Sequence, residues 1–155
     1  GPRPLGVFTT RSVRKGEVVL HGVTNGFSEI RTNYTIQVDL DMHAEVEDPA
    51  LHVNHSCSPT TGIRDNEWGC YDFVALVEGE HVPCAYDCCE LDSIAVPECR
   101  CGSPSCRKVI RGFRERCDLM MSLYPADLIP KYLTKWFASE HQKQQNGAVV
   151  SALAK

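Results

Sequence analysis

Nine cysteines in 155 residues are the feature that most constrains how this chain can fold. They are unevenly spread: three lie within ECRCGSPSC, residues 98–106, and three within PCAYDCCE, residues 83–90. An odd total with no secretory leader argues against a framework made only of disulfides. We therefore expect metal ligation together with free thiols, and a cytoplasmic or nuclear protein.

The spacing of the last three clustered cysteines is typical of a metal site. Cys99 and Cys101 place two thiols on the same side of an extended segment, and the turn-forming Gly102-Ser103-Pro104 brings Cys106 back towards them. Three converging thiolates suit Zn²⁺, which prefers tetrahedral sulfur and nitrogen ligands. The spacing alone does not supply the fourth ligand, and it leaves open a local disulfide or a coincidental cluster.

Composition limits the class of protein. A chain of 155 residues with 43% hydrophobic and 23% charged side chains suits one globular domain. With 16 Lys and Arg against 20 Asp and Glu the net charge is −4, so we expect no direct binding to nucleic acid. No apolar run approaches the ~20 residues of a membrane helix, so we expect no membrane partner either.

Periodicity predicts strands first and helices later. Alternating β-branched and polar residues around Lys15-Gly16 predict a hairpin, and alternation predicts further strands at 34–40 and 68–76 and a shorter one ending near Tyr86. Apolar residues at helical spacing predict amphipathic helices over 113–124 and 129–137, with Pro130 in the first turn of the second. These helices could cover a sheet face, form a dimer interface or border a substrate channel. Beyond His141 periodicity ends, so we expect a frayed tail.

Three motifs carry a resemblance to a known family. LHVNHSCSP (51–59), GEHVPCAY (79–86) and CRCGSPSC (99–106) occur in the order and approximate spacing of SET-domain lysine methyltransferases with a post-SET zinc segment. LGVFTTRSVRKGEVV resembles that family's first motif, and YTIQV resembles its middle strand. The resemblance covers roughly residues 3–112 and implies a mainly β fold, a SET-like β-clip of small sheets with a pseudoknot. It implies a SET-like domain at 3–98, a zinc segment at 99–112, C-terminal helices at 113–140 and a flexible tail at 141–155.

The resemblance also implies site residues. Cys57 would complete a four-thiolate site for one structural zinc ion with Cys99, Cys101 and Cys106, which leaves the other five cysteines as free thiols. Tyr86 matches the family's catalytic tyrosine. Residues implied for binding S-adenosylmethionine are Gly6, Val7, Phe8, Tyr34, Asn54 and His55, and those implied for the acceptor channel are Cys84 and Phe113.

The implied activity is S-adenosylmethionine-dependent methylation of a protein lysine, in a histone or another protein. A neutral amine would attack the methyl group in line, so activity should rise towards alkaline pH. The sequence departs from the family at Pro4, where a glycine is usual, and at Pro83 and Cys84. Two alternatives stay open: a SET-like biosynthetic enzyme that acts on a small molecule, with or without methyl transfer, and a non-catalytic, zinc-stabilised interaction module. Taken singly, Tyr86 is an ordinary strand tyrosine and His55 an ordinary loop histidine.

Overall fold

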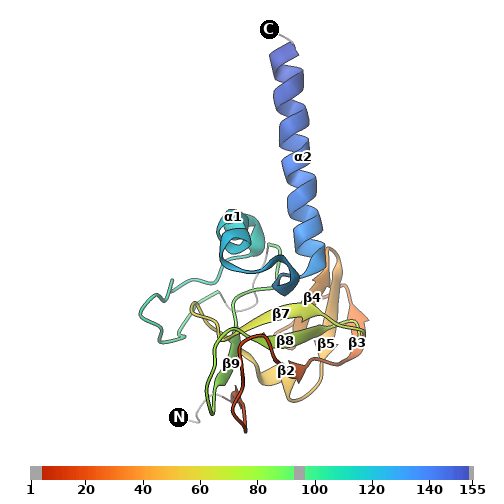
Figure 1. The fold of residues 1–155 in the computed structure, drawn as a ribbon. Coiled ribbons are helices and arrows are strands. Elements are labelled where there is room, and N and C mark those ends of the chain that lie inside the picture. Colours follow the sequence, from red (N-terminus) through yellow and green to blue (C-terminus); the bar gives the residue numbers. More distant parts are fainter. Residues whose placement is uncertain (1–4, 93–96, 154–155) are drawn as a thin grey trace.

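The computed structural model describes residues 5–92 and 97–153 of the chain. Three small three-stranded sheets make up its first part, and two helices follow (Figure 1). The prediction of small β-sheets followed by two C-terminal helices is therefore confirmed. None of the helices in the described residues combines the length and hydropathy that a membrane crossing requires.

The first two sheets join strands that are distant in sequence, whereas the third is formed within residues 24–46. The first has the order β1–β9–β6, and β6 runs parallel to β9 with Asn54 opposite Ala85 and His55 opposite Tyr86. The second has the order β2–β8–β7 and the third β3–β5–β4, both antiparallel. The strands are β1 (Val7–Phe8), β2 (Val18–His21), β3 (Thr24–Ser28), β4 (Thr35–Asp39), β5 (Met42–Val46), β6 (Asn54–His55), β7 (Thr61–Asp65), β8 (Tyr71–Ala75) and β9 (Pro83–Tyr86), with a 3-10 turn η1 (Ala50–His52) before β6.

The hairpin expected around Lys15-Gly16 is wrong. β1 pairs with β9 and β2 pairs with β8, so the two strands have different partners. Val13 bridges Gly79, and the Gly16 N–H donates to the Ala75 carbonyl at 2.8 Å. Alternation reveals a strand but not its partner, and here the segment between the strands pairs with a distant part of the chain instead of folding back.

The main core lies among the sheets. Tyr71 and Phe73 of β8 are fully buried and pack with Ile36, Ala44 and Ile63 from the neighbouring strands. The Tyr71 hydroxyl donates to the Gln37 carbonyl at 2.7 Å, which satisfies the polar end of a buried ring and ties the second sheet to the third. This core fixes the sheet edge on which β6 and β9 lie.

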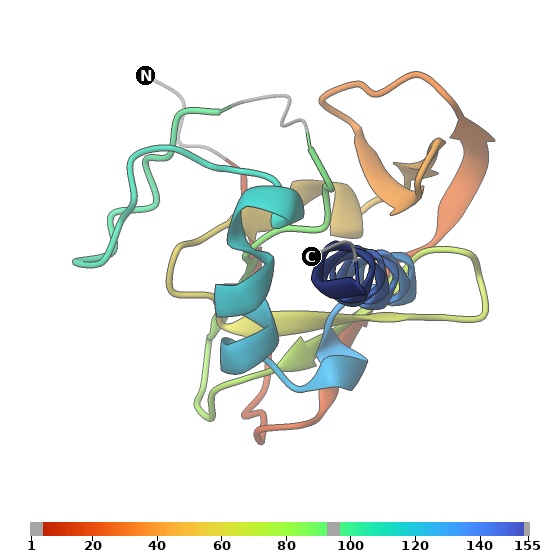
Figure 2. The ribbon, with the colours of Figure 1, turned by 90° about the horizontal axis from the view of Figure 1, so that it is seen from above.

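The helices form a second core on one side of the sheets. They are α1 (Phe113–Leu123) and α2 (Lys131–Leu153), joined through a 3-10 turn η2 (Ala126–Leu128). Figure 2 shows α1 lying beside α2, which is seen end-on. Their buried side chains include Phe113, Met120, Ile129 and Leu133.

Two contacts fix the start of α2 on the second sheet. The Leu128 side chain occupies the space beside Gly62, where a Cβ would lie 2.9 Å from it. The Lys131 N–H donates to Asp65 Oδ2 at 2.9 Å, so a carboxylate satisfies an orphan amide at the positive end of the helix. Pro130 directly precedes the helix, and its carbonyl accepts the Leu133 N–H.

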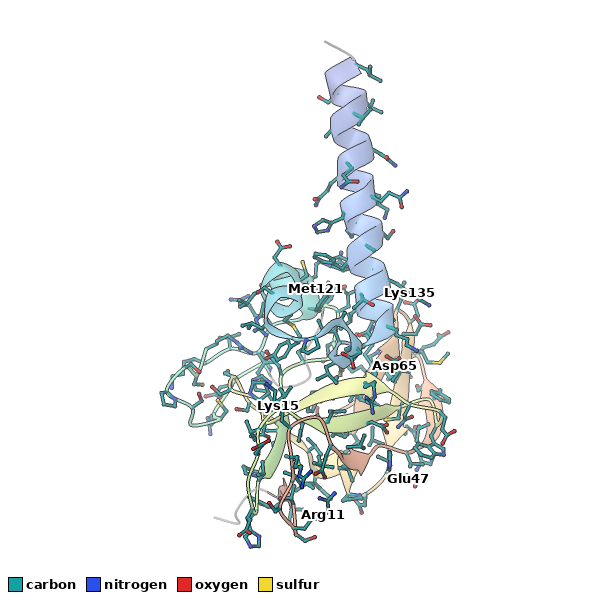
Figure 3. The ribbon with its side chains drawn as sticks, viewed as in Figure 1. Arg11, Lys15, Glu47, Asp65, Met121 and Lys135 are labelled. Carbon is teal, nitrogen blue, oxygen red and sulfur yellow. The ribbon has the colours of Figure 1, made fainter. Side chains whose placement is uncertain are left out.

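The chain beyond His141 does not leave the helix as expected, because α2 continues to Leu153. Figures 1 and 3 show this part standing away from the sheets with its side chains apart from the rest of the molecule. Gln, Lys and Ala are good helix formers, so the helix extends from an anchored first half without an apolar face.

Candidate metal centre and adjoining cavities

Four cysteines converge at the end of the first sheet. The sulfur atoms of Cys57, Cys99, Cys101 and Cys106 all lie within 4.8 Å of one another. Cys57 Sγ and Cys99 Sγ are 3.6 Å apart, far beyond the ~2.05 Å of a disulfide and close to the ~3.8 Å that separates thiolates on a tetrahedral metal ion. These four side chains can hold one metal ion, and no cysteine in the described residues forms a disulfide.

Backbone amides around the cluster favour the thiolate form that a metal needs. The Arg107 N–H donates to Cys57 Sγ and the Lys108 N–H to Cys106 Sγ, each at 3.4 Å. Backbone groups of Cys57 and Ser103 lower the pKa of the Cys101 thiol to about 6. Burial raises the pKa of the Cys99 thiol to about 12, so the sulfurs differ in how readily they ionise. A donor set of soft sulfurs is what zinc prefers.

Three serine hydroxyls hold the cysteine loop, which we define as residues 99–107, to the segment that carries Cys57. Ser58 Oγ lies 2.8 Å from both Ser103 Oγ and Ser105 Oγ, and the latter two are 3.0 Å apart. Each hydroxyl can donate to one neighbour and accept from the other. The triangle keeps the two halves of the cluster together at its exposed side.

A groove of about 960 Å³ runs between the first sheet and the cysteine loop. Five of the six residues predicted to bind the cofactor line it: Gly6, Val7, Phe8, Asn54 and His55. Asn54 Nδ2 donates to the Leu5 carbonyl at 3.0 Å, which holds the segment before β1 against β6. Segments almost fifty residues apart in the sequence thus form one wall. Pro4 lies outside the described residues.

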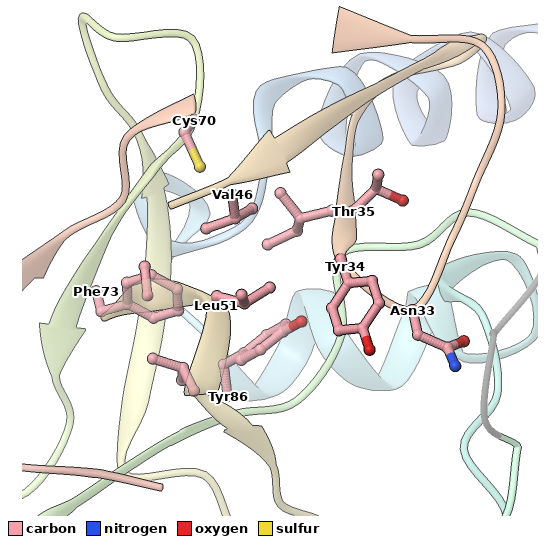
Figure 4. Close-up of a pocket in the computed structure, with 11 residues that line it drawn as sticks. Asn33, Tyr34, Thr35, Val46, Leu51, Cys70, Phe73 and Tyr86 are labelled. Carbon is pink, nitrogen blue, oxygen red and sulfur yellow. The ribbon is translucent and has the colours of Figure 1, made fainter. Parts of the chain in front are cut away.

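The sixth predicted residue, Tyr34, lies at a different cavity. It shares a smaller space of about 100 Å³ with Tyr86, Leu51 and Phe73. In Figure 4 the Tyr86 ring extends into this cavity and its hydroxyl points towards Tyr34. The Tyr86 ring meets Phe73 edge-on, with the ring centres 5.8 Å apart. Burial raises the pKa of Tyr86 well above its ordinary value, so its hydroxyl stays protonated.

The structure separates the two residues expected in an acceptor channel. Cys84 is buried and lines the groove instead of the cavity that holds Tyr86. Phe113 lines neither space: it is fully buried in the helix core and packs against Trp136 with ring centres 6.1 Å apart. An apolar residue on a helix stripe most often faces the core, and Phe113 follows that rule.

Sequence reasoning missed Asp87, the residue after Tyr86. Its side chain is only 4% exposed and accepts hydrogen bonds from Arg107, Arg116 and Tyr124. Its carbonyl lies 2.5 Å from His55 Nδ1. The available signal was a single acidic residue between Tyr86 and two cysteines, which does not reveal distant arginine partners.

His55 connects the groove to the cysteine cluster. Burial lowers its pKa, although the Asp87 carbonyl opposes that effect, so the ring is neutral near pH 7. A neutral ring that donates from Nδ1 to this carbonyl turns the lone pair of Nε2 towards Cys57 Sγ, 3.5 Å away. His55 of β6 therefore lines the groove and also lies beside Cys57 of the cysteine cluster.

Comparison with protein-family models and with curated proteins finds no match for this chain. The arguments for its function therefore come from the arrangement of its own residues and from the motifs in its sequence.

Proposed function

We propose that the chain is an S-adenosylmethionine-dependent protein-lysine methyltransferase whose cysteine loop is held by one structural zinc ion. One observation carries the proposal. Five residues that the SET resemblance assigns to the cofactor, from residues 6–8 and 54–55, line a single groove beside the cysteine cluster. Its volume lies in the range of small-molecule sites, ~300–1,000 Å³.

The proposal includes the SET-like arrangement of the chain. In that arrangement the segment of Asn54 and His55 passes beside the tyrosine segment as a pseudoknot. The parallel pairing of β6 with β9 supports it, because it sets His55 directly opposite Tyr86. The metal part of the proposal rests on Cys57, which lies next to this pairing and joins three cysteines more than forty residues away.

Zinc would have a structural task at this site. Four cysteine ligands leave no open position for a substrate, as is usual for structural zinc. Cys99 and Cys101 also line the groove, so closure of the loop around a metal shapes the wall that faces the cofactor. Metal binding would thus order the loop and complete the groove together.

The bound cofactor would supply a methyl group activated by a sulfonium charge. Asn54 and the backbone near Gly6 would bind the cofactor, and His55 would be held for this task by the Asp87 carbonyl. The protonated Tyr86 hydroxyl would orient the acceptor amine from the smaller cavity. Leu51 and Phe73 would exclude water around it.

The acceptor would enter from the side of Tyr34. This residue is 68% exposed at the mouth of the cavity that ends at Tyr86. A narrow space with Leu51 and Phe73 in its lining suits the methylene chain of a lysine and admits the amine in its neutral form. Activity should therefore rise with pH as the amine loses its proton.

A labelling experiment tests this function. Zinc-loaded protein is incubated with methyl-labelled S-adenosylmethionine and either histones or a lysine peptide array, and labelling that is lost in Tyr86→Phe is expected. Tyr71→Phe is the matched control, because it also removes a buried hydroxyl but lies at neither cavity. Absence of label at every acceptor, or equal labelling by Tyr86→Phe and the wild type, would contradict the proposal.

Cys84 favours a second candidate, a SET-like enzyme for a small molecule. The side chain lines the groove, and Phe113 is absent from both spaces, so the groove is wider than a lysine channel needs. Apolar small molecules that compete with S-adenosylmethionine, in the absence of any lysine labelling, would favour this candidate over the first.

A further inference from the structure

Asp87 joins three parts of the molecule through one buried carboxylate. Arg107 Nη2 donates to Oδ1 at 2.7 Å, Arg116 donates to both oxygens at 2.8 and 3.2 Å, and the Tyr124 hydroxyl donates to Oδ2 at 3.0 Å. Arg107 belongs to the cysteine loop, Arg116 lies on α1 and Tyr124 directly follows it. No other carboxylate in residues 5–92 and 97–153 has so many recorded hydrogen-bond donors.

Arg107 carries this connection to the metal centre. It follows Cys106, and its backbone N–H donates to Cys57 Sγ at 3.4 Å while its guanidinium donates to Asp87. A shift of the guanidinium would therefore move an amide that stabilises one of the four sulfurs. Groups in this position orient metal ligands and tune their charge.

The charges around Asp87 complement those of a loaded metal site. Burial acts to raise the pKa of Asp87, but hydrogen bonds and charges from Arg116 and Arg107 outweigh it and keep the pKa below its ordinary value. Two arginines and one carboxylate leave one positive charge, which lies beside Cys57. Four thiolates around a divalent ion carry two negative charges, so the arrangement is attractive.

We infer that Asp87 is a positioning residue for the metal centre, which it couples to α1 by holding Arg107, Arg116 and Tyr124 on one carboxylate. The inference rests on the metal part of the proposed function and is independent of methyl transfer. It makes α1 part of what retains the metal ion, although no residue of α1 belongs to the cysteine cluster.

The test measures release of zinc from the full chain to an excess of a chromogenic chelator at pH 7.5. Asp87→Asn should release zinc at least about tenfold faster than the wild type, the usual scale for such supporting residues. Tyr124→Phe keeps the ring and removes one hydroxyl, which donates to Asp87 and has no recorded hydrogen bond to the four clustered sulfurs. It should release zinc about two- to threefold faster. Hydrogen exchange should rise in residues 99–107 and 113–124 together in both variants.

Asp92→Asn is the matched control. Asp92 also pairs with an arginine of α1, Arg114, but it is exposed and has no contact with the cysteine loop. It should release zinc at the wild-type rate. The inference is overturned if folded Tyr124→Phe and Asp87→Asn both match the wild type, if Asp92→Asn behaves as they do, or if the wild type holds no zinc. Failure of the methyl-transfer proposal alone leaves these release rates as expected.

Discussion

The cysteine cluster, whose Cys57 follows β6, and the cavity at Tyr86 of β9 differ in what defines their chemistry. The cluster brings four sulfur donors within 4.8 Å, and these donors by themselves specify a soft, tetrahedrally coordinated metal. The cavity offers the protonated phenol of Tyr86 among polar and apolar side chains, including Asn33, Tyr34 and Phe73. Its chemistry depends on which molecule enters, so its function needs support from outside the cavity.

The two regions are also held differently. Tyr86 is fixed by strand pairing and by Phe73 in the sheet core. The cysteine loop has one isolated bridge, between Glu98 and Val109, and a few backbone hydrogen bonds, such as the one from the Cys106 N–H to the Ser103 carbonyl. Side-chain contacts and amide–sulfur hydrogen bonds add to these. The comparison predicts that metal removal unfolds the loop region while changes at Tyr86 leave the fold intact.

The largest effect is expected for Cys101→Ser. Losing one of four ligands should abolish stoichiometric zinc binding and lower the free energy of unfolding by at least about 5 kcal/mol, a part of the ~10–16 kcal/mol with which structural sites bind zinc. Elemental analysis and thermal unfolding measure both. Cys117→Ser is the control, since Cys117 lies on α1 outside the cluster. Unchanged zinc content in Cys101→Ser would contradict the assignment of the metal ion to the cysteine cluster.

Phe113→Ala tests the place of Phe113 in the helix core. Truncating a fully buried phenylalanine should lower the free energy of unfolding by about 3–5 kcal/mol, as measured by chemical denaturation. Phe113→Leu should recover most of this stability, and it should also keep the wild-type preference among lysine substrates. A change of substrate preference in a stable Phe113→Leu would instead indicate that Phe113 contributes to the acceptor channel.

Glu90 gives a pH-dependent effect on the Tyr86 side. Burial raises the pKa of Glu90 to about 7, against the opposing hydrogen bond from the Gln37 N–H. Between the ordinary glutamate pKa of 4.5 and about 7 the folded state holds the proton more tightly than the unfolded state. This group therefore lowers stability as pH rises through that window. Its negative charge also raises the pKa of Tyr86.

Glu90→Gln should remove this loss of stability at higher pH, because its side-chain amide does not titrate. Relative to the wild type, the variant should gain about 2 kcal/mol at pH 8 and nothing near pH 4.5, as seen in denaturation at the two pH values. Glu78→Gln, at an exposed position, should show no such difference. A gain of equal size at both pH values would show that the effect does not come from titration of Glu90.

The smallest effect on stability is expected for Tyr86→Phe, at most about 1 kcal/mol, because its hydroxyl pairs with the Cys89 thiol, a weak hydrogen-bonding group. Tyr71→Phe removes a hydroxyl bonded to the Gln37 carbonyl and should cost about 1–2 kcal/mol. Tyr71→Phe should thus lose more stability than Tyr86→Phe, whereas Tyr86→Phe should lose more methyl transfer than Tyr71→Phe. Equal loss of stability in both would weaken the contrast between the regions.

Local patterns predicted part of the elements, but not β3, β5, β6 or β7, and the pairing of the strands came only with the fold. Alternation identified β4, β8 and β9, and helical spacing identified α1 and the start of α2, because these patterns report which face of an element is buried. The partners of β1 and β2 depend on contacts more than fifty residues away in the sequence, and alternation does not encode them.

The residues of the candidate site were likewise predicted only in part from local sequence patterns. The spacing of Cys99, Cys101 and Cys106 predicted convergence, but Cys57 came from the motif resemblance, since no spacing rule spans forty residues. Tyr34 and Cys84 were each expected beside different neighbours from those the structure gives them, because they line two separate spaces. Asp87 was missed because its arginines are twenty or more residues away.

Calorimetric titration of S-adenosylmethionine into the zinc-loaded chain tests the central claim most directly. The account predicts saturable heat with one site per chain, and at least tenfold weaker binding in Asn54→Ala, whose side chain lines the groove and holds the segment before β1. Asn66→Ala, away from the groove, should bind as the wild type does. No heat from a folded, zinc-containing wild type would contradict the account.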